Sequence, residues 1–284
     1  MKRLKRFYIP LLISCAFLFF SFLDNSDLNP VKLMSQMTDS IRNVRTMRVR
    51  ISATERIETK FLYAVSRIKL QTHPRKLYFL NPEKKLEILY VSGENGGKAL
   101  VKPHIFPFVP MYLEPMGNLM RKNQHYTIHE LGYEFIGRSV AFTLNKDKDG
   151  LKNFSYHGKV MKNGFMCYLL EYENKNYSYV DYIVREKETV SSIALKNCVN
   201  DYLIRYNNDL VNDFGYLKKG KVLKIPNLYC KKAVIYIEEG HMLPVVLALF
   251  DDKGVFEYYE FTELEINKPI RSEEFTRSYP EYHF

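Results

Sequence analysis

Hydrophobic positions along the chain follow a helical period once and then alternate for most of its length. After a polar stretch at 24–28, Asn29 and Pro30 are a typical helix cap and first-turn residue. The next apolar positions recur at helical spacing and are Leu33, Met34, Met37, Ile41 and Val44. From residue 47 the period changes to two, with apolar Met47, Val49, Ile51 and Ala53. The pattern predicts one amphipathic helix followed by a strand with one buried face.

Further alternating segments predict an antiparallel meander rather than alternating strands and helices. We expect strands near 61–70, 76–80, 86–91, 155–161, 165–173, 233–238, 245–250 and 255–264, separated mostly by short turns. The Asn163-Gly164 pair between two of them is a strong hairpin signal. Glycines 93, 96 and 97 fit a hairpin turn and lack the lysine and hydroxyl pattern of a phosphate loop.

Two segments interrupt this meander. Between Pro103 and Pro115 four prolines alternate with apolar residues, which predicts an extended segment at a sheet edge or beside a cavity and argues against a central strand. Thr127 and Glu130 form a capping box in front of an apolar run, so a second helix is expected to begin there and to end before residue 145.

Residues 179–229 have a different pattern of apolar and polar positions from the segments on either side. We expect a strand at 181–184, helices at 190–196 and 200–206, and a final strand at 221–225. Thr189 is a suitable cap for the first of these helices. A small core is available from Ile193, Ala194, Leu203, Ile204, Leu217, Val222, Leu223 and Ile225. The segment is therefore predicted to be a βααβ module inserted in a larger domain.

Short motifs in this module resemble the LysM consensus in order and spacing. They are Tyr182-Ile183-Val184, Glu188-Thr189-Val190, Ser192-Ile193-Ala194, Tyr206-Asn207 and the run 217–226. LysM modules bind polymers that contain N-acetylglucosamine, in bacteria peptidoglycan, in a shallow groove between two loops. The resemblance therefore implies a glycan-binding site formed by Glu188, Thr189, Val190, Leu210, Phe214, Tyr216 and Leu217.

This chain departs from the LysM pattern beside the implied groove. Lys187-Glu188-Thr189 stands where Gly-Asp-Thr is usual, and the loop 208–216 is somewhat long. A degenerate module kept as a spacer is therefore the alternative to a working glycan site.

A second set of motifs lies outside the module, in residues 27–178 and 230–284. It includes Lys69-Leu70, Pro74, Tyr78, Tyr90-Val91-Ser92-Gly93, Pro115-Met116-Gly117-Asn118, Asn123-Gln124-His125, Leu243-Pro244, Tyr258-Tyr259, Leu264-Glu265-Ile266-Asn267 and Phe275. These motifs resemble a bacterial envelope family of unknown function with a lipoprotein-carrier-like (LolA-like) fold. The implied fold class is α+β, with a curved, incompletely closed antiparallel sheet wrapped over helices.

The same resemblance implies a hydrophobic cavity for an acyl chain or a lipid-modified peptide. A fully packed core would use the same inward-facing residues, so the alternation does not separate the two possibilities. For this reason no lipid-contacting residue is assigned from the sequence.

The N-terminus predicts export. A basic start at 1–6 leads into an uncharged apolar stretch at 7–23, which is typical of a signal peptide or an N-terminal anchor. Ser21, Phe22 and Leu23 make a poor cleavage site, so both alternatives stay open. Cys15 ends a passable lipoprotein box but is followed by apolar residues, which leaves lipidation as a third alternative. The expected location is the periplasm or the membrane-associated cell envelope.

Composition and candidate chemistry narrow the function. The formal charge is +10, but four of the positive charges lie in the first six residues and no dense basic run follows, which argues against nucleic acid as a partner.

No carboxylate pair, Cys-His pair or zinc spacing is recognisable, so we expect no enzyme activity and no cofactor. His125 and His129 flank the predicted helix start and are expected to be structural. Cys167, Cys198 and Cys230 allow one disulfide at most.

Together these features predict a non-catalytic envelope protein. The module is expected to bind peptidoglycan, and the surrounding β domain a lipid, lipoprotein or protein partner. The alternative is a periplasmic lipid or lipoprotein carrier whose module does not bind glycan, and a cell-wall hydrolase is a third candidate.

Overall fold

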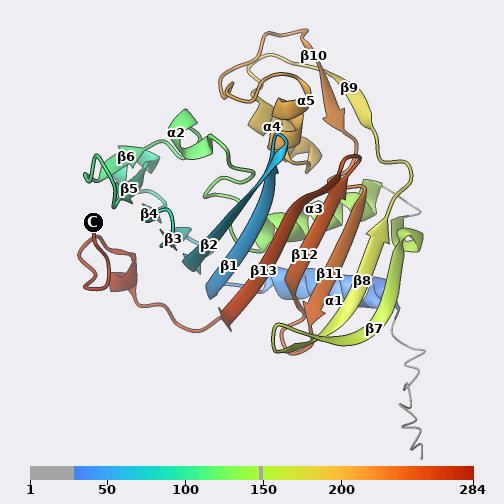
Figure 1. Cartoon of the computed structure of the whole chain (residues 1–284), viewed down its shortest axis with the longest axis horizontal. Helices are drawn as coiled ribbons and strands as arrows, with labels where there is room; N and C mark the ends of the chain where they lie inside the picture. Colours follow the sequence, from blue (N-terminus) through green and yellow to red (C-terminus); the bar gives the residue numbers. More distant parts are fainter. Residues whose placement is uncertain (1–28, 147–149) are drawn as a thin grey trace, which may run out of the picture.

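Most of the strands form one large antiparallel sheet that does not close on itself (Figure 1). The computed structural model describes residues 29–146 and 150–284, and in that part of the chain the strand order is β6-β5-β4-β3-β2-β1-β13-β12-β11-β8-β7. The strands are β1 (Thr46–Ile57), β2 (Lys60–Gln71), β3 (Lys76–Asn81), β4 (Leu86–Val91), β5 (Ala99–Pro103), β6 (Met111–Leu113), β7 (Phe154–Lys162), β8 (Phe165–Glu173), β11 (Lys232–Glu238), β12 (Leu243–Asp251) and β13 (Gly254–Ile266). The predicted meander is confirmed, and β6, in the proline-rich segment, is an edge strand as expected.

Two helices cover one face of the sheet, α1 (Pro30–Arg42) and α3 (Glu134–Lys146), and in Figure 1 they lie behind the strands. The Asn29 side chain caps α1 by accepting a hydrogen bond from the Val31 amide at 2.9 Å, as predicted. Leu33, Met34 and Met37 of α1 are fully buried against the sheet. The remaining short helices of this domain are α2 (Asn118–Arg121), η1 (Asn95–Gly97), η2 (Gly150–Asn153) and η3 (Ser272–Phe275).

The expected start of the second helix at Thr127 is wrong. The capping-box hydrogen bond does form, because the Thr127 amide lies 2.8 Å from the Glu130 carboxylate, but α3 begins only at Glu134. Gly132 has a φ of +99°, which a continuous helix from Thr127 cannot contain. A Cβ at this position would come within 2.6 Å of Leu70 Cδ2. The backbone is therefore held close to β2 before it turns into the helix.

The C-terminal segment covers the outer face of β3, β4 and β5. A separate apolar cluster forms there, and its buried members are Tyr78, Leu89, Val91, Leu100, Phe275, Tyr279 and Tyr282. The rings of Tyr78 and Tyr282 stack with centroids 3.6 Å apart. Glu274 joins this segment to the sheet, because its carboxylate accepts from Lys69 and Arg48 at 2.9 Å each. Both faces of this half of the sheet are therefore covered.

Residues 179–226 form the expected βααβ arrangement, made of β9 (Tyr179–Ile183), α4 (Val190–Asn197), α5 (Asp201–Asn207) and β10 (Val222–Pro226). β9 and β10 pair in a sheet of their own, and the module has its own apolar cluster. Thr189 caps α4 together with Ser192. The module lies beyond the tip of the β1–β2 hairpin (Figure 1), where the Glu58 amide donates to the Tyr202 hydroxyl at 2.6 Å.

Cys167, Cys198 and Cys230 form no disulfide. The expected signal peptide or anchor at 1–23, with Cys15, lies outside the described residues. Within residues 29–146 and 150–284, no helix is long and apolar enough to span a membrane.

Candidate functional site

A cavity lies between the sheet and its two covering helices, and small side chains on β1 and β2 create it. The register of these strands places Ala53 opposite Ala64 and Ile51 opposite Ser66, with all four side chains on the face toward the helices. Because Ala53, Ala64 and Ser66 are short, the centre of the sheet leaves a hollow where larger residues would fill the core. Phe79, Ile88 and Val101 from β3, β4 and β5 extend the apolar floor.

The roof and one wall come from helices and from the loop between them. Met34 and Met37 of α1 and Ile136 and Val140 of α3 close the roof, while residues 119–132 form the wall. The volume of the cavity is about 350 Å³. This volume falls in the range of small-molecule pockets, which is roughly 300–1,000 Å³.

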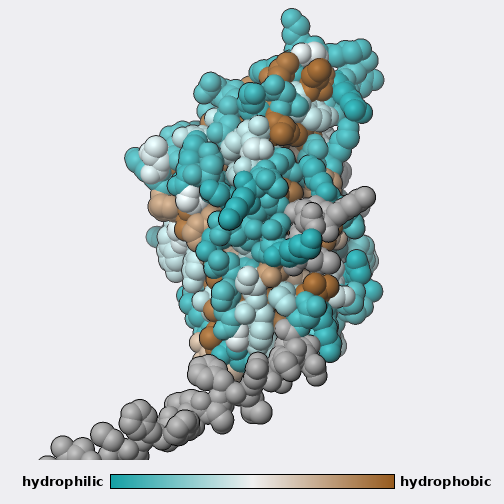
Figure 2. Space-filling view, turned by 90° about the vertical axis from the view of Figure 1, so that its right-hand side faces the viewer, coloured by the Kyte–Doolittle hydropathy of each residue, from teal (hydrophilic) through white to brown (hydrophobic). Residues whose placement is uncertain are grey.

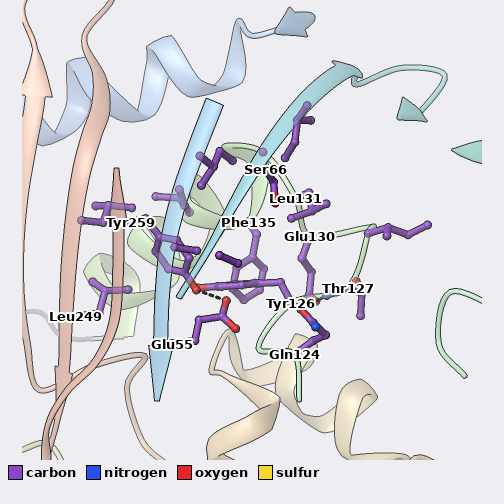
Figure 3. A pocket seen from close by; sticks show the side chains of 18 of the residues that line it. Glu55, Ser66, Gln124, Tyr126, Thr127, Glu130, Leu131, Phe135, Leu249 and Tyr259 are labelled. Carbon is purple, nitrogen blue, oxygen red and sulfur yellow. Dashed lines mark hydrogen bonds between the residues drawn. The ribbon is translucent and has the colours of Figure 1, made fainter. Parts of the chain in front are cut away.

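One end of the cavity is polar (Figure 3). Glu55 and Tyr259 line this end, and the Tyr259 hydroxyl donates to the Glu55 carboxylate at 2.6 Å. Tyr126 and Phe135 lie beside this pair, and Glu130 faces the same space from the wall loop. Burial raises the pKa of Glu130 and so favours its neutral form. The cavity thus combines a long apolar interior with a few hydrogen-bonding groups at one end.

A buried network supports this polar end. The Glu257 carboxylate is fully buried and accepts hydrogen bonds from Tyr126 at 2.9 Å, Tyr229 at 3.1 Å and Asn200 at 2.7 Å. His125 lies 2.7 Å from the same carboxylate. Burial raises the pKa of both Tyr126 and Tyr229, so their hydroxyls stay protonated and can donate.

His125 also meets an acceptor on its other nitrogen. Its Nε2 lies 3.0 Å from the Arg56 carbonyl oxygen. Burial alone would lower the pKa of His125, but the Glu55 charge and the Glu257 hydrogen bond raise it. His129 instead packs edge-on against Tyr90. The two histidines thus have separate structural contacts, and among the described residues no three His, Cys, Asp or Glu side chains gather as a metal site.

The cavity opens to solvent at the end of the sheet that carries the β3–β4 turn. Leu62, Lys84 and Leu119 line the cavity and are also exposed. The opening exists because β3 pairs with β2 only from Arg67 to Gln71, so the first part of β2 extends past its neighbour.

A second, wider cleft of about 960 Å³ runs across α1, α3 and the start of α4. Its lining contains several charged side chains, including Arg42, Arg75, Arg138 and Glu134. Arg75 is already held by Glu134 at 3.0 Å and by the carbonyl oxygens of Ile128 and Leu131. Arg75 therefore offers no unpaired charge to a ligand in this cleft.

The structure brings the two loops of the implied glycan groove together. The Leu217 amide donates to the Glu188 carbonyl oxygen at 2.9 Å. Three of the seven predicted residues, Val190, Leu210 and Leu217, are buried in the module's own core. Tyr216 is 76% exposed beside this junction.

The other three predicted residues have contacts within the protein. Thr189 caps α4, and the Glu188 carboxylate accepts from the Tyr182 hydroxyl at 2.7 Å and the Arg185 amide at 2.8 Å. The Phe214 ring lies against the guanidinium groups of Arg121 and Arg205, 5.6 Å and 4.8 Å from the ring centre. Glycan binding by these seven residues remains a prediction.

The fold and the cavity define an α+β protein with one open antiparallel sheet wrapped over two helices around an apolar interior. A family model described as protein of unknown function (DUF1571) matches residues 44–199, which is more than half of the chain. The chain therefore belongs to the DUF1571 family. The matched range ends inside the module, between α4 and α5.

Comparison with curated proteins gave no match. Among solved structures, the MucA/MucB complex of Pseudomonas aeruginosa is 8% identical over 87% of this chain and 60% of the other, with a TM-score of 0.41. LprF from Mycobacterium bovis is 8% identical over 85% of this chain and 94% of the other, with a TM-score of 0.43. For lipoprotein LppX of Mycobacterium tuberculosis the identity is 12%, the coverages are 85% and 97%, and the TM-score is 0.37. This chain spans less than two thirds of the length of the MucB chain. These likenesses are distant.

Proposed function

We propose that this protein binds a lipid or a lipid-modified peptide in the cell envelope by enclosing its apolar chain between the sheet and the helices. The cavity is the observation that supports this proposal. Water that enters through the open end would otherwise contact the apolar lining, and covering that lining with an apolar chain gains roughly 25 cal/mol per Å² of apolar surface removed from water.

The polar end of the cavity suits the head of such a ligand. Glu55, Tyr126 and Tyr259 supply hydrogen-bonding groups at the end of an otherwise apolar space. A ligand with an acyl chain and a compact polar head satisfies both parts, whereas a wholly polar ligand would leave the apolar floor uncovered. We assign no catalytic step to this site. Export of the protein rests on the predicted signal peptide or anchor at 1–23.

Native mass spectrometry of protein purified without detergent tests the proposal. The protein is expected to carry a mass that is lost on delipidation. Ser66→Phe fills the cavity and should abolish this extra mass, and Ala64→Phe serves as a second filling variant if the first folds poorly. Ser52→Phe is the matched control, because Ser52 is next to the cavity-lining Ile51 and therefore points to the opposite face of β1. An extra mass that persists in both filling variants would refute binding in the cavity.

A second candidate activity belongs to the module. We propose that the βααβ unit is a LysM module inserted at 179–229 and that it binds N-acetylglucosamine-containing glycan, with Tyr216 as the ring that stacks on a sugar. The observation that favours this activity is the exposed Tyr216 beside the joined loops.

The test is co-sedimentation of residues 27–284 with purified peptidoglycan. Tyr216→Ala should reduce sedimentation, while Val222→Ala, which changes an exposed residue of β10, should not. Equal sedimentation of both variants would remove Tyr216 from the site, and no sedimentation of the unmodified protein would favour a carrier with an inactive module.

A further inference from the structure

Exposed apolar side chains are concentrated at one end of the molecule. Of the seventeen large apolar residues that are exposed in the described part of the chain, ten fall within 61–63 and 105–119. Phe106 is 85% exposed and Leu119 is 78% exposed. We use the name docking rim for Leu62, Ile105, Phe106, Phe108, Val109 and Leu119.

Two of these residues lie at the mouth of the cavity, and the other four lie on the β5–β6 loop. Leu62 and Leu119 line the cavity directly. The loop that carries Phe106 lies beside the β3–β4 turn, because the His104 amide donates to the Lys85 carbonyl oxygen at 2.7 Å. Antiparallel pairing of β1 to β6 places this turn, the β5–β6 loop and the β1–β2 tip at the same end of the sheet. By contrast, the face at the β7 edge is mostly hydrophilic with scattered apolar residues (Figure 2).

The docking rim has a positive border. The charged residues on or beside the connections around it are Lys60, Lys84, Lys85, Lys98, Lys102 and Lys122 against Glu58, Glu83 and Glu114, which leaves three positive charges in excess. Lys102 is anchored to the loop itself, since its ammonium group donates to the Phe108 carbonyl oxygen at 2.5 Å. Apolar side chains bordered by lysines match the layered chemistry of a membrane surface with anionic head groups.

We infer that the docking rim inserts into the surface of an anionic lipid bilayer and brings the cavity mouth against it. A soluble acidic protein would meet the lysines but would leave Phe106 and Leu119 without an apolar counterpart. The rim is also continuous with the cavity, so a chain can pass between bilayer and cavity without crossing water. Docking is separate from chain binding, and only its use in loading the cavity rests on the proposed function.

Vesicle co-sedimentation of residues 27–284, which contain every described helix and strand, tests the inference. The vesicles are equal parts phosphatidylglycerol and phosphatidylcholine, compared with phosphatidylcholine alone. Phe106→Ser combined with Phe108→Ser should lower partitioning about tenfold or more, because two exposed rings no longer leave water on docking. The control combines Met161→Ser with Ile183→Ser, which are exposed apolar residues away from the rim, and should partition like the unmodified protein.

The charge of the vesicles supplies the second readout. Partitioning should be stronger on the phosphatidylglycerol vesicles and should fall as salt is added, because exposed charges are screened. Equal partitioning of the double-serine variant and the unmodified protein, or an equal loss in the control, would overturn the inference. Native mass spectrometry of the same variants separates the two proposals. Protein that carries no lipid but binds vesicles would overturn the proposed function alone, and lipid-loaded protein that ignores vesicles would overturn docking alone.

Discussion

Asp201 joins the module to the rest of the protein through a buried ionic cluster, which makes Asp201→Ala an informative substitution. Its carboxylate pairs with Arg121 of α2 and Arg205 of α5, and it also accepts from the Ser191 hydroxyl at 2.9 Å. Arg121 is 1% exposed and Arg205 is fully buried. Burial lowers the pKa of Arg205, which reflects how unfavourable the charge is in this place without a partner.

The expected loss of stability follows from what remains after the substitution. Alanine would leave two buried guanidinium groups without a carboxylate, and breaking a buried pair typically costs about 3–5 kcal/mol. The Nε atoms of both Arg121 and Arg205 already lack a hydrogen-bond partner, and the remaining acceptors of these two groups are uncharged oxygens and a sulfur atom that do not neutralise them. At roughly 2–4 °C per kcal/mol for a chain of this size, the Tm should fall by about 10 °C.

Thermal and urea unfolding, followed by circular dichroism, measure this loss. The control is Asp181→Ala, because Asp181 pairs with Lys224 at 2.7 Å on an exposed surface. Such exposed pairs contribute about 0–1 kcal/mol, so the control should unfold almost like the unmodified protein. If Asp201→Ala lost no more stability than Asp181→Ala, the idea that this cluster holds the module in place would be refuted.

Two further substitutions test other parts of the fold. Although burial alone would raise it, hydrogen bonds from Lys69, the Arg271 amide and Arg48 lower the pKa of Glu274 to about 2. A lowered pKa contributes stability above the unfolded value near 4.5, and this contribution is lost as the pH falls toward about 2. Glu274→Gln should therefore cost about 1.5–3 kcal/mol at neutral pH and flatten the urea midpoint between about pH 5 and pH 2; an unchanged acid profile would contradict this. Gly132→Ala should cost roughly 1–3 kcal/mol from its φ of +99° and the approach of Leu70, whereas Gly158→Ala, at a φ of +94° in open space, should cost less. Equal losses in both glycine variants would show that the contact with Leu70 adds nothing.

Most strands and the βααβ order follow from local patterns and are predicted from the sequence, whereas the short strand β5 next to the proline-rich segment is not. Alternation has a period that a strand must satisfy, and Asn163-Gly164 adopts the positive φ values that its hairpin requires. The capping box at Thr127 shows the limit of local signals. Its hydrogen bond forms as predicted, yet the contact between Gly132 and Leu70, sixty-two positions apart in the chain, delays the helix.

The cavity depends on information that alternation does not contain. Ala53, Ala64 and Ser66 are each ordinary inward-facing residues, and only the register between β1 and β2 gathers them into one hollow. Three short residues spaced along two neighbouring predicted strands were the available signal, and it has meaning only once the pairing is known. A cavity is a property of volumes summed over several elements, whereas a strand is a property of one segment.

For the module too, the sequence pattern predicts its own elements but not its contacts with the rest of the protein. The residue pattern predicts the βααβ order of the module but says nothing about the surface on which the module rests. Phe214 belongs to the implied glycan groove by its place in the loop, yet Arg121, far away in the sequence, lies against its ring. If Phe214 is part of the interface with the rest of the protein, Phe214→Ala should lower stability, and if it is part of a glycan site the same change should lower binding without unfolding the module. Tyr216, two residues further on, has no such packing and should affect glycan binding alone, so the pair of variants separates the two roles of this loop.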